Sequence, residues 1–216
     1  MIPDNRTDAY LESLCSGNGP FLDELEKTAR VEDIPIIRPS VRNLLKVMIA
    51  ARCPKEILEV GTAVGFSAIL MAQSMSADCR ITTIEKYEKR IPAAKENFKK
   101  AGYDDRITLL EGDAADILKE LKEKGNKYGL IFMDAAKGQY LNFFEDVMAL
   151  LDEGGVLVSD NVLQEGDILQ SRYAVCRRDR TIHSRMREYL YVLTHDERLE
   201  TVILPVDDGV SVSVKR

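Results

Sequence analysis

The sequence predicts an α/β fold built on a mostly parallel sheet. From Lys55 onward, short apolar runs alternate with amphipathic segments, the pattern of strands joined by covering helices. Only Pro205 to Gly209 separate the last two apolar runs, too short a link for a parallel crossover. We therefore expect an antiparallel hairpin at one edge of the sheet.

A helical extension is expected before the first strand. Apolar residues recur at helical spacing on both sides of a break at 17–20, and a third helix is expected over 40–52. The extension, residues 1–52, covers a site, forms a dimer surface or packs on the sheet, and the sequence leaves these readings open. Together with a core over 53–216 it is expected to form a single domain, 1–216, because no linker, repeat or low-complexity tract interrupts the chain.

The core is expected to alternate strands and helices in a regular order. Strands are predicted at 57–60, 81–84, 107–110, 130–133 and 156–158, with intervening helices at 66–75, 89–102, 114–121 and 140–151. After Asn161 the regular alternation of strands and helices ends, and a long polar stretch follows. A helix containing Met186 to Leu193 follows, and strands at 200–204 and 210–214 end the core.

Composition narrows the class of protein. The 216 residues are 45% hydrophobic and 31% charged with a net charge of −6, which describes an ordinary soluble globular chain. That balance argues against wholly electrostatic nucleic-acid binding, although a local basic patch is compatible with it. The four cysteines lack zinc-ligand spacing, and no apolar run is long enough to span a bilayer. We expect free thiols, no membrane association and a cytoplasmic location.

Oxygen ligands follow two of the predicted strands. Asp134 ends the run Leu130 to Met133, and Asp160 and Asn161 end the next strand. In open α/β sheets, ligands bind beyond the carboxyl ends of the strands. These hard oxygen donors suit Mg²⁺ or a similar cation, which a substrate with two adjacent oxygens would also bind. The alternative for each acid is a helix cap or a solvated strand end.

A glycine-rich turn and a second acid indicate a nucleotide-like ligand. Gly61 and Gly65 follow the first strand in a spacing that departs from the dinucleotide fingerprint, so a purely structural turn is the alternative. Glu85, at the end of the second strand, is placed to bind the ribose of an adenosine-containing ligand, or is simply solvated. Asp113 serves the adenine, caps the next helix, or does both.

Together these motifs resemble the cation-dependent, S-adenosylmethionine-using O-methyltransferases, the family that contains catechol and caffeoyl-CoA methyltransferases. The resemblance covers about residues 35 to 216 and implies the Rossmann-like, seven-stranded class I methyltransferase fold with an antiparallel edge strand. It implies S-adenosylmethionine and Mg²⁺, or another divalent cation, as cofactors. The implied cofactor-binding residues are Glu59, Gly61, Gly65, Ser67, Glu85, Gly112, Asp113, Ala114 and Asp134. The implied metal ligands are Asp134, Asp160 and Asn161, and the catalytic residues are Asp134 and Lys137, the latter as general base or as a passive cation beside the oxyanion.

A basic segment points to a polyanionic substrate. Residues 171–187 hold six arginines and one acid in a chain of net charge −6. Arginine suits phosphate because of its bidentate fork, although a solvated loop and helix face would look the same. The expected RNA contacts are Arg172, Arg177, Arg178 and Arg180.

Within the family, the stretches 134–144, 160–163 and 203–209 resemble bacterial enzymes that methylate 5-hydroxyuridine to 5-methoxyuridine at the wobble position of tRNA. The resemblance implies the tRNA anticodon loop as partner, and we also expect a homodimer. A small-molecule O-methyltransferase acting on catechol-like vicinal hydroxyls is the alternative. The sequence leaves open which tRNAs are used, the preferred metal, the dimer interface and the order of residues 164–180 without substrate.

Overall fold

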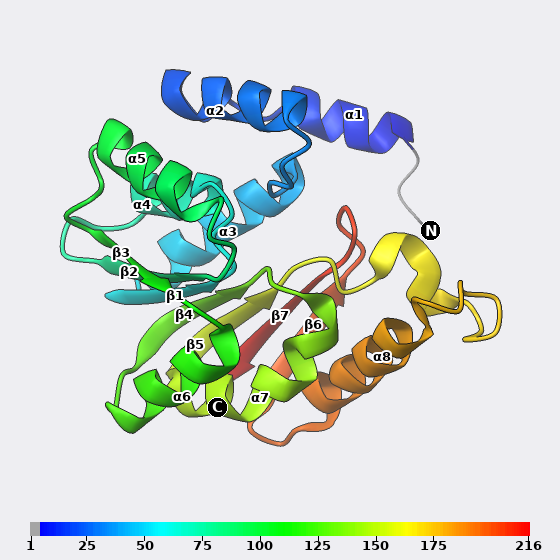
Figure 1. The fold of residues 1–216 in the computed structure, drawn as a ribbon. Coiled ribbons are helices and arrows are strands. Elements are labelled where there is room, and N and C mark those ends of the chain that lie inside the picture. Colours follow the sequence, from blue (N-terminus) through cyan, green and yellow to red (C-terminus); the bar gives the residue numbers. More distant parts are fainter. Residues whose placement is uncertain (1–4) are drawn as a thin grey trace.

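A seven-stranded sheet in the order β3-β2-β1-β4-β5-β7-β6 forms the centre of the protein. The computed structural model describes residues 5–216 (Figure 1). The strands are β1 Glu56–Val60, β2 Arg80–Glu85, β3 Ile107–Glu111, β4 Tyr128–Met133, β5 Leu151–Ser159, β6 Leu199–Leu204 and β7 Val210–Lys215. β1 to β5 are parallel, whereas β7 runs antiparallel to both of its neighbours. The predicted fold and its antiparallel hairpin at one edge are confirmed.

The central strand β4 shows why the sheet is covered on both faces. All six of its residues are buried, as expected for a near-continuous apolar run in a parallel sheet. Successive side chains point to opposite faces, so Leu130 and Phe132 join one core cluster, and Ile131 and Met133 join the other. Each face therefore needs its own layer of helices.

The helices supply those two layers (Figure 1). Helices α2 to α5 contribute to the first core cluster, and α6 to α8 contribute to the second. Their bounds are α1 Asn5–Ser13, α2 Pro20–Val31, α3 Pro39–Arg52, α4 Phe66–Ser74, α5 Ile91–Ala101, α6 Ala114–Glu123, α7 Tyr140–Leu150 and α8 Arg180–His195. Proline stands in the first turn of α2, α3 and α5, where its missing N–H costs no helical hydrogen bond.

Two local predictions were wrong. β5 begins at Leu151, which pairs with Tyr128 of β4, so the helix before it ends one residue earlier and the strand starts sooner than predicted. Short 3₁₀ helices occupy Lys137–Gln139 (η1) and Gln164–Leu169 (η2), where no regular element was expected. At three and six residues, these helices are too short to carry a helical repeat of apolar residues.

Two findings bear on the expectations drawn from composition. All four cysteines are free thiols. Between Asn5 and Arg216, none of the helices is long and apolar enough to cross a lipid bilayer.

Candidate active site

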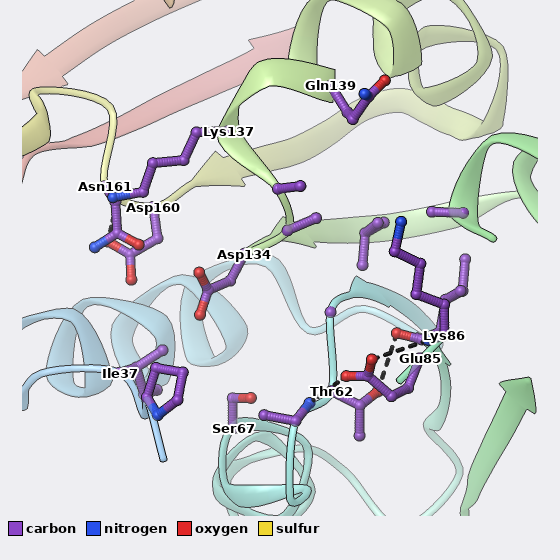
Figure 2. Close-up of a pocket in the computed structure, with 18 of the residues that line it drawn as sticks. Ile37, Thr62, Ser67, Glu85, Lys86, Asp134, Lys137, Gln139, Asp160 and Asn161 are labelled. Carbon is purple, nitrogen blue, oxygen red and sulfur yellow. Dashed lines mark hydrogen bonds between the residues drawn. The ribbon is translucent and has the colours of Figure 1, made fainter. Parts of the chain in front are cut away.

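A cavity of about 710 Å³ lies at the carboxyl ends of the parallel strands (Figure 2). Its wall includes most of the predicted site residues: Gly61, Ser67, Glu85, Gly112, Asp113, Ala114, Asp134, Lys137, Asp160 and Asn161. Residues 35–38, between α2 and α3, also line it. Part of the N-terminal extension therefore borders the site, one of the roles left open by the sequence.

Gly61 allows two strand ends to meet inside this cavity. The backbone at Gly61 has a φ of 101°, and a side chain there would collide with the carbonyl oxygen of Asp134. The Asp134 N–H donates to the Val60 carbonyl at 3.0 Å. Glycine is thus required for the end of β1 to lie against the residue that leaves β4.

Glu85 fixes the glycine-rich turn. Its Oε2 accepts a hydrogen bond from the Ala63 N–H at 2.8 Å, and its Oε1 accepts from the N–H groups of Lys86 and Tyr87 at 2.9 and 2.8 Å. These three bonds occupy most of the roughly four acceptor positions of a carboxylate. In this arrangement Glu85 keeps room on Oε2 for about one hydrogen bond to a ligand hydroxyl.

Asp113 caps α6 while it borders the cavity. Its side chain accepts a hydrogen bond from the Ala115 N–H at 3.0 Å, and Lys86 Nζ lies 3.3 Å from its Oδ2. The Ala115 hydrogen bond is the main reason why the pKa of Asp113 is lowered. The capping role is therefore present in the structure, and the side chain still faces the ligand space.

Two of the predicted cofactor residues lie behind the cavity wall. Glu59 is fully buried and accepts a hydrogen bond from Thr83 Oγ1 at 2.5 Å. Burial raises the pKa of Glu59 to about 7, although hydrogen bonds from Ser67 and Thr83 oppose the shift. Gly65 precedes α4 with a φ of 86° and packs against the Phe98 ring. Both residues support the turn from beneath.

Asp134, Asp160 and Asn161 face a common part of the cavity (Figure 2). Asp160 is 3% exposed, and its Oδ1 accepts a hydrogen bond from the Asn161 N–H at 2.7 Å. Burial raises the pKa of Asp134 to about 6, and burial together with the Asp134 charge raises the pKa of Asp160 to about 7. A bound cation would favour the ionised form of both carboxylates.

This donor set fits a hard divalent cation. Over residues 5–216, no three His, Cys, Asp or Glu side chains are grouped as a metal site of their own. The third donor is the side chain of Asn161, whose backbone adopts the left-handed conformation (φ 55°) that asparagine tolerates. Two carboxylates and one amide leave coordination positions for water and substrate, as Mg²⁺ usually requires.

Lys137 is held by an acid that the sequence did not single out as a site residue. Its Nζ lies 3.3 Å from Oδ2 of Asp208, which is 5% exposed and lines the cavity. The β6–β7 turn docks on the segment after β5 through Val162 N–H to Gly209 O and Leu163 N–H to Asp208 O, both 2.9 Å. The sequence signal for this residue was its place in the turn after β6. Because β6 and β5 both run antiparallel to β7, β6 ends at the same edge of the sheet as β5.

Tyr140 lies in the core behind the cavity, whereas Phe143 lies in the cavity wall. Tyr140 is fully buried, and its hydroxyl lies 3.1 Å from the carbonyl oxygens of Met133 and Asp160. It thereby braces the ends of β4 and β5 from the core. Phe143 is 4% exposed and contributes to the cavity wall.

The basic segment lies beside the cavity and outside its wall. None of the four arginines expected to contact RNA lines the cavity. Arg185 NH1, in α8, donates to the Gly138 carbonyl at 2.9 Å, which places α8 against η1 and hence next to Lys137. Arg180 is partly structural, because it donates to the carbonyls of Val175 and Tyr173 at 3.3 Å each.

The sheet order and the ligand space at the strand ends define a Rossmann-like methyltransferase fold. A profile of the O-methyltransferase family matches residues 12–216, and the chain belongs to that family. A catechol O-methyltransferase of Mycobacterium tuberculosis is 32% identical over 164 residues, which cover 75% of this chain and 74% of that protein.

Solved structures show the same relationship. An O-methyltransferase from Bacillus cereus in complex with SAH has a TM-score of 0.85 at 25% identity, covering 98% of this chain and 97% of that one. An SAH-bound methyltransferase from Podospora anserina has a TM-score of 0.87 at 27% identity, covering 100% and 98%.

Proposed function

We propose that the protein transfers a methyl group from S-adenosylmethionine to one of two adjacent oxygens of a substrate, with the help of a divalent cation. The observation that carries this proposal is one cavity shared by the glycine-rich turn with Glu85 and by Asp134, Asp160 and Asn161. SAH is what S-adenosylmethionine becomes after methyl transfer, so the SAH-bound relatives support the choice of methyl donor.

Each part of the cavity has a role in this reaction. Glu85 and the turn at Gly61 bind the donor, while Asp134, Asp160 and Asn161 hold the cation. The cation supplies positive charge that lowers the pKa of a substrate hydroxyl. Lys137, as the neutral amine, accepts the hydroxyl proton, and Asp208 then holds the ammonium group that results. Alignment of the oxygen with the methyl group then supplies much of the rate.

The acceptor that we propose is 5-hydroxyuridine in the anticodon loop of tRNA. The basic segment beside η1 supports this choice, since its exposed arginines suit phosphate. The 5-hydroxyl and 4-carbonyl of the base are adjacent oxygens. Recognition of a base splayed out from a single-stranded loop would bring them into the cavity.

A small molecule with vicinal hydroxyls is the second candidate. It is favoured by the catechol and caffeoyl-CoA O-methyltransferases among the relatives, such as the catechol enzyme of M. tuberculosis. The same cation chemistry would serve such a substrate, because its two oxygens are also adjacent.

The two acceptors are distinguished by offering both to the enzyme. Methyl transfer from labelled S-adenosylmethionine is measured with tRNA from a strain that lacks the modification, and with catechols. We expect labelled tRNA, with the label in 5-methoxyuridine, and loss of this nucleoside from total tRNA when the gene is deleted. Transfer to catechols alone would reject the tRNA acceptor and leave the small-molecule reaction.

The exposed arginines provide a second test. Arg177→Ala combined with Arg178→Ala is expected to weaken tRNA binding and to reduce the salt dependence of log K by about 0.7 per lost phosphate contact. Binding is measured across a salt series. Lys99→Ala combined with Lys119→Ala removes the same charge from exposed helix positions elsewhere and is the control. An equal salt slope in the wild type and the arginine variant would contradict the prediction.

A further inference from the structure

A second cavity lies along α8 and shares no lining residue with the first. Its volume is about 420 Å³, and it is lined by Gln170, Ser171, Arg172, His183, Ser184 and Arg187. None of these six residues is acidic, two are arginines, and two carry hydroxyl groups. In a protein of net charge −6, this is a local environment that suits an anion.

His183 lacks one of the partners that a buried imidazole needs. The residue is 2% exposed, and its Nε2 lies 3.2 Å from the Gln170 carbonyl oxygen. Its Nδ1 is buried, and residues 5–216 offer it no hydrogen-bond partner. Since the carbonyl can only accept, Nε2 donates to it, and Nδ1 is the ring nitrogen that the fold leaves unsatisfied beside the cavity that His183 lines.

The cavity adjoins the active site through the first turns of α8. Ile182 lies beside Gly138, and Arg185 donates to the Gly138 carbonyl at 2.9 Å, while the neighbouring His183 and Ser184 line the second cavity. One helix, roughly 10–12 Å across with its side chains, thus separates the cavity from η1 and Lys137. That spacing is short enough for neighbouring parts of one RNA strand to occupy both places.

An exposed aromatic ring stands next to this cavity. Tyr173 is 81% exposed, and its N–H donates to Oγ of Ser171, a lining residue, at 3.4 Å. The Arg180 guanidinium lies 5.8 Å from the ring centroid and restrains it. A positively charged groove combined with an aromatic platform is how proteins hold single-stranded nucleic acid.

We propose that this cavity binds a backbone phosphate of a nucleotide next to the one being methylated, and that Tyr173 stacks on the base of that nucleotide. The proposal rests on the RNA acceptor proposed above. It assigns Arg172, His183 and Arg187 to the phosphate, and it makes the basic segment a binding site with a defined pocket.

The phosphate site is tested first without RNA. Inorganic phosphate is titrated into the full-length protein while the imidazole NMR signals of His183 are followed, with His195, the only other histidine, as internal reference. We expect a saturable shift at His183, an affinity about tenfold weaker in Arg172→Ala, and no change in Lys119→Ala. A His183 signal that does not respond to phosphate would overturn the proposal.

The RNA role is tested separately by kinetics. Arg172→Ala is expected to raise KM for tRNA about tenfold, and Tyr173→Ala to raise it severalfold with rescue by Tyr173→Phe, because a phenyl ring still stacks. Equal KM values for Arg172→Ala and Lys119→Ala would overturn the RNA role. An enzyme that leaves tRNA unmethylated refutes the proposed acceptor and with it this role, whereas the phosphate titration still decides whether the cavity binds an anion.

Discussion

The buried carboxylates behave differently from the surface acids of this chain. Asp160 and Glu59 are 3% and 0% exposed, and burial raises the pKa of each to about 7. Structural carboxylates more often have lowered pKa values, as Asp196 does beside Arg198. Strongly raised values next to a cavity are typical of functional groups and of their immediate supports.

At Asp160, we expect substitution to separate catalysis from donor binding. Asp160→Ala removes a proposed cation ligand and should lower turnover more than about a hundredfold, while affinity for S-adenosylmethionine changes little. Initial rates with Mg²⁺ and calorimetric binding of the donor measure the two effects. Asp116→Ala, at an exposed position in α6, is the control. Full activity in the Asp160 variant would exclude this residue as a ligand.

At Glu59, we expect a pH-dependent stability. Folding raises the pKa of Glu59 from 4.5 to about 7. With respect to this group, the free energy of unfolding is therefore highest below about pH 4.5 and declines as the pH rises toward 7. Glu59→Gln removes this decline, which amounts to roughly 3 kcal/mol by linkage. Urea unfolding of both proteins between pH 5 and 8 measures it, at fixed ionic strength. Parallel pH profiles for the two proteins would contradict the assignment.

Among the elements, the N-terminal helices tie the extension to the active site. Arg42 in α3 is 4% exposed; its Nε donates to the Ile37 carbonyl at 2.9 Å, and its NH1 and NH2 bind the Glu26 carboxylate at 2.6 and 2.9 Å. Its guanidinium also lies 4.7 Å from the centroid of the Phe66 ring. One side chain therefore joins α2, α3 and α4 to the cavity-lining segment that contains Ile37.

We expect Arg42→Met to loosen this segment. Arg42 is the buried member of a part-buried ion pair, and its removal leaves the Glu26 charge without its main partner, which should cost about 3 kcal/mol of stability, the lower end of the range for buried pairs. Arg30→Met removes the exposed partner of the same carboxylate and should cost at most about 1 kcal/mol. Urea unfolding compares them, and KM for S-adenosylmethionine should rise only in the Arg42 variant. Equal effects of the two substitutions would refute the special role of Arg42.

Among the secondary-structure elements, the strands were easier to predict from the sequence than the short 3₁₀ helices. The runs at 57–60 and 81–84 became β1 and β2, which are buried over most of their length, and the run at 107–110 became β3 at the edge of the sheet, where one residue is buried. η1 and η2 escaped prediction, although η1 carries Lys137. Their conformation depends on contacts with α8, such as Arg185 with Gly138 and Arg187 with the Ile168 carbonyl, which lie far along the chain.

For the whole molecule, the cation is the decisive requirement of the proposed reaction. We expect EDTA to stop methyl transfer and excess Mg²⁺ to restore it, because the two carboxylates and Asn161 are the only proposed means of acidifying the substrate hydroxyl. Rates are measured with and without chelator. Donor binding measured calorimetrically in EDTA is the control and should persist. Undiminished transfer in EDTA would rule out the cation-dependent mechanism.

The homodimer stays a prediction.

The sequence by itself determined the strands, the covering helices and the carboxyl-end acids, because apolar periodicity and turn residues are local properties. Tertiary structure alone decided that β7 lies between β5 and β6, that Asp208 holds Lys137, and that residues 35–38 border the cavity. It also brought Arg172, His183 and Arg187 around one cavity. Such contacts join residues far apart in the chain, and they form only when the sheet and its two helical layers pack.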